Sequence, residues 1–200
     1  PVFGGSLTLD GEPLAVKNTR DATARELFLV PEDRKGAGVL LDFSIAQNIT
    51  LPNLEAYSRS GIVSEAAEIS RAERSKAELD IRAPNVQVST GALSGGNQQK
   101  VALAKWRAMN PRVIILDEPT RGIDVGAKFE IYRIMRGLAD AGVAVLMISS
   151  DMEEVIGVSD RIAVMHEGRI SGMLTRDQFS EENVLMLAVG HTGKGGGTAA

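Results

Sequence analysis

The hydrophobic pattern near the N-terminus predicts a hairpin followed by a buried strand. Residues 6–10 alternate between polar and apolar, Asp10-Gly11 is a dipeptide typical of two-residue turns, and residues 12–16 return along the hairpin. Residues 27–30 are apolar throughout, and Pro31 ends this run because proline lacks the amide that a central strand needs. We therefore expect a short antiparallel pair and then a strand in the core.

The middle of the chain is predicted to be mostly helical. Gly36 and Gly38 indicate a loop, and helical character then extends over residues 44–109. Ser64 precedes a polar stretch and is expected to cap a helix there, because its hydroxyl can accept a hydrogen bond from a free amide of the first turn.

After Pro111 the pattern changes to strands that alternate with helices. Residues 113–116 form an apolar run of strand length, which is typical of a strand buried on both faces, and further strands are expected at 143–148 and 161–165. Between the first two strands, helical spacing relates Ala127, Ile131, Ile134, Met135 and Leu138. Gly142 is expected to end that helix. Strand, helix, strand, helix, strand is the pattern of a parallel sheet covered by helices.

The C-terminal residues predict a hairpin, a helix and a tail. Residues 164–172 are expected to turn at Glu167-Gly168, and Ser180 is expected to cap a helix that ends at about Val189. Residues 193–200 are rich in glycine and polar side chains, which predicts a disordered tail.

Composition and charge exclude several classes of protein. The apolar fraction of 44% with 24% charged residues is ordinary for a globular protein. A net charge of −4 argues against a nucleic-acid binder that depends on neutralising phosphates, and no nucleic-acid partner is expected. The absence of cysteine excludes disulfides and thiolate sites. The longest apolar runs, such as residues 143–148, are too short to cross a bilayer.

One candidate for chemistry is the acidic pair that ends the strand at 113–117. Ligands of open α/β sheets bind at the carboxyl ends of the strands, so Asp117 and Glu118 are expected to face a site. Asp117 could hold Mg²⁺ through its water shell, and Glu118 could polarise an attacking water. Two solvated acids at the end of a strand are the alternative interpretation.

A second candidate is the glycine-containing loop before the helix that begins near Gly96. Ser94, Gly95 and Gly96 would present backbone amides at a helix N-terminus, where the helix dipole favours an anion. A loop that merely caps the helix is the alternative for this motif taken alone.

Together the two motifs resemble the ABC ATPase family. The run Leu93-Ser94-Gly95-Gly96 is followed by glutamines and lies upstream of a hydrophobic strand that ends in Asp117-Glu118-Pro119-Thr120. The resemblance implies a signature loop at 93–98, a Walker B strand at 113–118 and a D-loop at 122–124. It extends over residues 6–189 and implies ATP and Mg²⁺ as cofactors.

The resemblance also implies a role for individual residues. Asp117 would hold the metal, and Glu118 and Ser150 would be the catalytic positions. The nucleotide-binding positions would be Glu32, Ser94, Gly95, Gly96, Asn97, Gln98 and Asp124. Because cassettes of this family pair head to tail, the signature loop would contact ATP that is held by a second cassette.

Further motifs resemble the second cassette of tandem sugar-importer ATPases. The runs that carry this likeness are residues 30–35, 95–100 and 118–127. The likeness implies an ATPase that powers sugar import from the cytoplasmic face of a bacterial inner membrane, where it is peripheral. Its partners would be transmembrane permease subunits, a second cassette and, indirectly, a periplasmic sugar-binding protein.

Three departures from the family pattern predict a weakened site. No segment matches G-x-x-x-x-G-K-[ST]; Gly190 to Lys194 is a near miss with the wrong spacing, and we expect the phosphate loop to lie upstream of residue 1. Ser150 occupies the position of the switch histidine, and serine cannot carry the charge of an imidazole. Glu32 stands where the family has glutamine.

These expectations define a fold class and a set of domains. The expected fold is α/β, a P-loop NTPase-like parallel sheet flanked by helices, with a helical signature subdomain and part of an antiparallel β subdomain, truncated at its N-terminus. The expected regions are 1–35 for the β remnant and Q-loop strand, 36–110 for the helical subdomain, 111–192 for the core and 193–200 for the tail. The alternatives are a soluble ABC ATPase of DNA repair or translation and a cassette without catalysis. The 200-residue chain alone is expected to bind ATP weakly.

Overall fold

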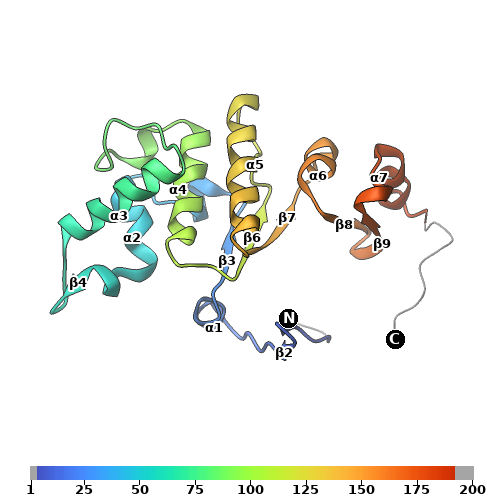
Figure 1. Ribbon diagram of the computed structural model, residues 1–200, viewed down its shortest axis with the longest axis horizontal. Coiled ribbons are helices and arrows are strands. Elements are labelled where there is room, and N and C mark those ends of the chain that lie inside the picture. Colours follow the sequence, from blue (N-terminus) through green and yellow to red (C-terminus); the bar gives the residue numbers. More distant parts are fainter. Residues whose placement is uncertain (1–3, 192–200) are drawn as a thin grey trace. The chain divides into compact units, whose positions relative to one another are not determined.

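The computed structural model describes residues 4–191, and the predicted tail at 193–200 lies outside them. The chain forms two compact units, Pro1–Leu146 and Met147–Ala200, and each is described by itself (Figure 1). The predicted boundaries at 35/36 and 110/111 both fall within the first unit and stay predictions.

The first unit begins with the predicted hairpin. Strands β1 (Thr8–Leu9) and β2 (Glu12–Pro13) pair antiparallel, and the two residues between them have positive φ angles, 52° at Asp10 and 82° at Gly11. Two central residues with positive φ are the signature of a tight hairpin turn that suits the twist of the strands. Helix α1 (Thr19–Ala24) follows, with Asn18 capping it.

A three-stranded sheet follows the order β3-β6-β7, with β3 at Leu27–Val30, β6 at Val113–Asp117 and β7 at Ala144–Ile148. Strands β3 and β6 are parallel, with registers from Leu27↔Val113 to Val30↔Leu116. Ile114 and Leu116, which lie on one face of β6, are fully buried, whereas Val113 and Ile115 on the other face are only half-buried, so the predicted burial on both faces holds for one face. The strands predicted at 27–30 and 113–116 are thereby confirmed, and their pairing with each other was not predicted.

The segment between β3 and β6 is mostly helical, as predicted. Its first element is not the predicted loop but a turn of π-helix, η1 (Arg34–Gly38), which Asp33 caps by accepting a hydrogen bond from Gly36 N. The helices that follow are α2 (Ile45–Thr50), the 3₁₀ segment η2 (Leu51–Tyr57), α3 (Glu65–Glu78), η3 (Thr90–Ala92) and α4 (Gly95–Arg107). Ser64 caps α3, as predicted.

A small hairpin interrupts these helices and was not predicted. Strands β4 (Ser58–Arg59) and β5 (Ile62–Val63) pair antiparallel around Ser60-Gly61, where φ is again positive at both residues. Ile62 is 75% exposed at this hairpin.

Helix α5 (Val125–Asp140) runs beside α4 (Figure 1). Its buried residues Ile131, Met135 and Leu138 belong to the predicted apolar face. Gly142, with φ of 89°, follows the last turn as expected.

The second unit has its own core. It contains α6 (Met152–Val158), β8 (Arg161–His166), β9 (Arg169–Thr175), the 3₁₀ turn η4 (Arg176–Gln178) and α7 (Glu181–Ala188), which Ser180 caps as predicted. The side chains of its core are Ile162, Val164, Leu174, Val184 and Leu187.

The prediction that residues 161–165 form the third strand of a parallel sheet was wrong. In the described residues β8 pairs with β9 in an antiparallel sheet of two strands, turning at Glu167-Gly168 as predicted. Strand β8 alternates buried and exposed side chains, which is typical of an antiparallel strand with one face on the core. The third member of the sheet is β3.

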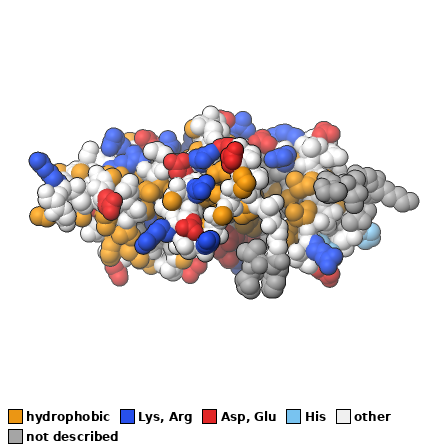
Figure 2. Space-filling model, turned by 90° about the horizontal axis from the view of Figure 1, so that it is seen from below, with side chains coloured by type: hydrophobic (Ala, Val, Ile, Leu, Met, Phe, Trp, Pro, Cys, Tyr) orange, Lys and Arg blue, Asp and Glu red, His pale blue; other side chains and the backbone are white. Residues whose placement is uncertain are grey.

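The surface carries mixed charges. On the face shown in Figure 2, basic and acidic side chains lie among apolar ones. Within residues 4–191, none of the helices is both long enough and apolar enough to cross a bilayer.

Candidate functional site

The N-terminus of α4 carries the glycine-containing loop. Ser94 occupies the N-cap position, but its side chain makes no capping hydrogen bond. The first hydrogen bond of the helix type runs from Gln98 N to Ser94 O, at 2.9 Å, so the amides of Gly95, Gly96 and Asn97 precede the bonded turns. Ser94 is exposed, which leaves its hydroxyl at the surface beside the positive end of the helix dipole.

The two glycines of this loop have close neighbours within the chain. A Cβ atom built on Gly96 would lie 2.7 Å from Cβ of Ala127 in α5, and one built on Gly95 would lie 2.8 Å from Nη2 of Arg34. The Cβ of Ala127 is fixed to the backbone of α5, so packing requires glycine at position 96, whereas the end of the Arg34 side chain can move to admit a Cβ at position 95.

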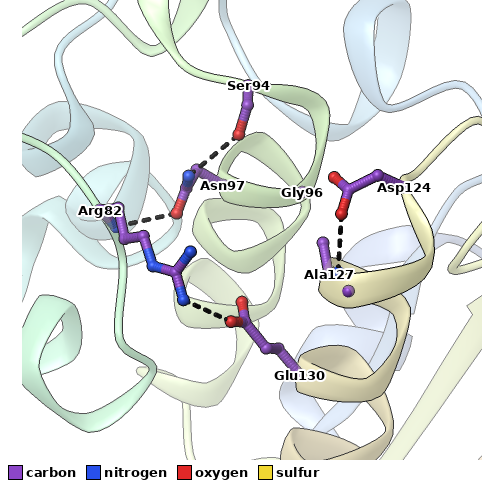
Figure 3. Close-up of a pocket in the computed structure, with 8 residues that line it drawn as sticks. Arg82, Ser94, Gly96, Asn97, Asp124, Ala127 and Glu130 are labelled. Atoms are coloured by element: carbon purple, nitrogen blue, oxygen red, sulfur yellow. Dashed lines mark hydrogen bonds and ion pairs between the residues drawn. The ribbon is translucent and has the colours of Figure 1, made fainter.

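A pocket of about 300 Å³ opens between the N-terminal parts of α4 and α5 (Figure 3). Its lining residues are Arg82, Ser94, Gly96, Asn97, Asp124, Gly126, Ala127 and Glu130. The pocket therefore brings together three residues of the predicted signature loop and the predicted D-loop residue Asp124.

Gln98, another predicted signature residue, faces inward. Its side chain is 5% exposed, and Nε2 donates to Leu93 O at 3.1 Å and to Thr90 O at 3.4 Å. Gln98 thus holds the loop that carries Ser94 in place, rather than lying at the pocket.

Asp124 begins helix α5. Its Oδ1 accepts a hydrogen bond from Ala127 N at 2.9 Å, which makes it the N-cap (Figure 3). One carboxylate oxygen is therefore engaged in holding the helix start, while the residue still lines the pocket.

Asp117 and Glu118 end strand β6, and both are half-buried. Glu118 has a φ of 46°, in the left-handed region that a non-glycine residue seldom adopts. Its carbonyl accepts a hydrogen bond from Arg121 N at 3.1 Å, so a tight turn follows the strand. The backbone thus changes direction at the residue predicted to be catalytic.

Glu32 lies at the same edge of the sheet. Strand β3 ends at Val30, whose partner in the register is Leu116, and the carboxyl ends of parallel strands meet at one edge. Glu32 forms an ion pair with Nη1 of Arg121. The Arg34 guanidinium donates in turn to Arg121 O at 2.9 Å and to Gly122 O at 3.4 Å. The loop after β3 is therefore tied to the turn after Glu118.

Ser150 belongs to the second unit and is exposed. It follows β7 and precedes Asp151, whose Oδ1 caps α6 by accepting from Glu154 N at 3.2 Å. Ser149 Oγ donates to the buried carboxylate of Glu154 at 2.5 Å. These bonds fix the turn that carries Ser150.

A charged network that includes two lining residues of the pocket, Arg82 and Glu130, was not predicted. Lys100, whose side chain is 2% exposed, lies 2.8 Å from Oε2 of Glu130, and Arg82 Nη2 donates to the other oxygen at 2.6 Å. The hydrogen bond from Lys100 holds the pKa of Glu130 below its ordinary value, against the opposing effect of burial. The signal in the sequence was a lysine within an otherwise buried helix, since a buried lysine needs a partner.

Among the described residues, no three His, Asp or Glu side chains gather closely enough to hold a metal ion by themselves. Mg²⁺ that binds with a nucleotide needs only one or two carboxylates, because phosphates and waters supply the other ligands. The half-buried carboxylate of Asp117 fits that requirement.

Comparisons with known proteins find clear relatives of this chain. Residues 3–121 match the family model described as ABC transporter. The ribose import ATP-binding protein RbsA of Lactococcus lactis is 46% identical over 186 residues, which are 93% of this chain and 38% of that protein. The xylose import ATP-binding protein XylG of Moorella thermoacetica is 49% identical over 93% of this chain and 37% of its own length. The chain thus spans less than two fifths of these relatives.

Solved structures show the same fold. A dimeric ATP-binding cassette solved with ADP and Pi superposes with a TM-score of 0.71 at 21% identity, covering 88% of this chain and 75% of that one. The structure of cbiO1 from Clostridium perfringens, part of the cbiONQ ABC transporter complex, gives a TM-score of 0.70 at 23% identity, covering 89% and 69%. The α/β cassette fold expected from the sequence is confirmed.

Proposed function

Because this chain belongs to the ABC transporter family, we propose that it forms part of an ATP-hydrolysing subunit that powers the import of a sugar. The names of its relatives, which import ribose and xylose, support the class of substrate. The tandem arrangement, with this chain in the second cassette, is part of the proposal. So is a peripheral position at the cytoplasmic face of a bacterial inner membrane.

The signature loop completes the ATP site of a second cassette that pairs head to tail. The single observation that carries this role is the exposed, uncapped start of α4 at Ser94. A terminal phosphate presented by the partner cassette would accept hydrogen bonds from the Ser94 hydroxyl and the amides that follow it. Gly96 and Asn97 line the same pocket, and Gln98 holds the loop from behind.

The edge of the sheet serves this cassette's own nucleotide. Asp117 would hold Mg²⁺, which when bound neutralises charge on the phosphates. Glu118 would polarise the attacking water, and Glu32 and Ser150 would stand near the terminal phosphate. Glu32 is already engaged with Arg121, and Ser150 cannot take a proton as histidine does, which supports a weak site here.

The helical segment contacts the transmembrane permease subunits. Leu40 and Phe43 are 43% and 39% exposed on this segment, and Ile62 is 75% exposed at the β4-β5 hairpin. Exposed apolar side chains of this kind suit a protein partner. A periplasmic sugar-binding protein would act on the transporter indirectly, from the other side of the membrane.

The test compares Ser94→Ala with Glu118→Gln in the full-length protein assembled with its permease. We expect Ser94→Ala to lower ATP turnover at least tenfold, because the partner site loses a donor to phosphate, and Glu118→Gln to have the smaller effect. Ser70→Ala, on the exposed face of α3, is the matched control and should change turnover less than twofold. If Glu118→Gln abolishes hydrolysis and Ser94→Ala is harmless, the division of roles is wrong.

A further inference from the structure

We propose that Asn97 is a positioning residue that keeps the Ser94 hydroxyl as a hydrogen-bond donor toward phosphate. The inference rests on the proposed function of Ser94 and adds to it the device that sets the direction of its proton. It depends on a chain of contacts that runs from Ser94 through Asn97 to the backbone of Arg82 (Figure 3).

The orientation of the Asn97 amide is fixed by an unambiguous donor. The backbone amide of Arg82 lies 2.8 Å from Oδ1 of Asn97, and a backbone N–H can only donate. The oxygen of the side chain must therefore face Arg82, although the oxygen and nitrogen of an amide are otherwise hard to distinguish. The nitrogen, Nδ2, then faces Ser94 Oγ at 3.0 Å and donates to it.

This donation determines what Ser94 can do. A serine hydroxyl has one proton to donate and two lone pairs that accept. Because Asn97 occupies a lone pair, the proton of Ser94 is directed away from Asn97. Ser94 is exposed and makes no capping bond to its own helix, so the proton can serve a ligand. Phosphate oxygens accept hydrogen bonds, so a phosphate could accept the proton that the Ser94 hydroxyl donates.

The buried Lys100 and the charged groups around it hold the backbone of Arg82 in place. Lys100 Nζ donates to Asp80 O at 2.5 Å, two residues before Arg82. Lys100 also pairs with Glu130 at 2.8 Å, and the guanidinium of Arg82 reaches the same carboxylate at 2.6 Å. Residues 80–82 are thereby attached to both α4 and α5, and the amide that orients Asn97 cannot turn away freely.

The decisive substitution is Asn97→Asp in the full-length protein with its permease. Aspartate keeps the acceptor for Arg82 N but loses the donor for Ser94, so the serine proton would turn toward the new carboxylate. We expect kcat/KM for ATP to fall at least tenfold. Asn85→Asp is the matched control: Asn85 is exposed in the same loop, and its Oδ1 accepts from Gln87 N at 2.9 Å, a role that aspartate retains. This control should change kcat/KM less than twofold.

A double-mutant cycle separates positioning from a general structural role. Asn97→Ala alone should lower kcat/KM severalfold, and the same change should have less than a twofold effect in a Ser94→Ala background. If the losses of kcat/KM caused by Asn97→Ala and Ser94→Ala multiply in the double variant, the inference is wrong. It is also wrong if Asn97→Asp is as harmless as Asn85→Asp while Ser94→Ala is harmful. In both cases the proposed function stands. A harmless Ser94→Ala would overturn the proposed function and the inference together. Thermal unfolding of each variant verifies that it is folded. Should Asn97→Asp not fold, the double-mutant cycle with alanine provides the test by itself.

Discussion

The glycines at the start of α4 differ in how far the fold depends on them, and Gly96 has the least room. Its missing Cβ would lie 2.7 Å from the Cβ of Ala127, an atom fixed to the backbone of α5. We expect Gly96→Ala to lower the free energy of unfolding by about 1–3 kcal/mol, because α4 and α5 must separate to admit the methyl group. Chemical denaturation of the full-length protein measures this change.

Gly137 is the matched control for that substitution. It lies in α5, the helix that carries Ala127, it is exposed, and a Cβ built there would meet no atom within 4 Å. Alanine at this helical position should raise stability by about 0.5–1 kcal/mol, since it restricts the unfolded chain and favours the helix. Equal effects at Gly96 and Gly137 would show that α4 and α5 are not packed as described.

At the scale of the helix, Asp124 has a capping role that can be separated from its charge. Asparagine caps helices about as well as aspartate, whereas alanine loses the bond to Ala127 N, which costs about 0.5–2 kcal/mol. We therefore expect Asp124→Asn to keep the free energy of unfolding and Asp124→Ala to lower it. If ATP turnover falls equally in both variants, the charge of Asp124 matters at the nucleotide; if only the alanine variant is affected, Asp124 acts through α5 alone.

The contact between α4 and α5 should also depend on pH through Glu130. Its pKa is held below the ordinary value of 4.5, chiefly by the hydrogen bond from Lys100. A carboxyl whose pKa is lower in the folded state contributes stability above the unfolded pKa and loses it as pH falls through the folded one. The difference in free energy of unfolding between the native protein and Glu130→Gln should therefore be large at pH 7 and become smaller below pH 4.5.

Urea denaturation across this pH range measures that difference. Glu73→Gln removes a carboxylate from an exposed pair with Lys76, 3.9 Å apart, and should give a small difference throughout because surface pairs contribute little. A difference for Glu130→Gln that does not change with pH would contradict the stabilising role of the Lys100–Glu130 pair.

Elements with a clear period were predictable, and of the two short hairpins only the one that turns at Asp10-Gly11 was predicted. The apolar run of β6 and the helical face of α5 gave the strand and the helix directly. Strands β4 and β5 have two residues each, too few to establish an alternation, although Ser60-Gly61 was a usable turn signal. The partner of β8 depended on pairing between strands, which the hydrophobic pattern of one strand does not specify.

The candidate site shows the same limit. Ser94, Asp117 and Glu118 were identified because their motifs are contiguous in the sequence. The network of Arg82, Lys100 and Glu130 was missed because its members are separated by up to 48 residues, and only the fold brings them together. The capping role of Asp124 could be anticipated from its place before α5, whereas the inward orientation of Gln98 required the structure.

At the scale of the whole molecule, the two units should be able to lose structure separately, because the second has a core of its own around Leu174 and Leu187. Leu174 is 8% exposed, and its truncation to alanine should destabilise this core by about 2–5 kcal/mol. Hydrogen exchange should then become faster in residues 161–188 while residues 113–138 of the first unit stay protected. Met173→Ala, the neighbouring position on β9 with 56% of its side chain exposed, should leave both regions unchanged. Equal loss of protection in both regions would mean that the chain unfolds as one cooperative body. A substitution that destabilises the residues near Ser150 would then affect the signature loop only by lowering the stability of the whole chain.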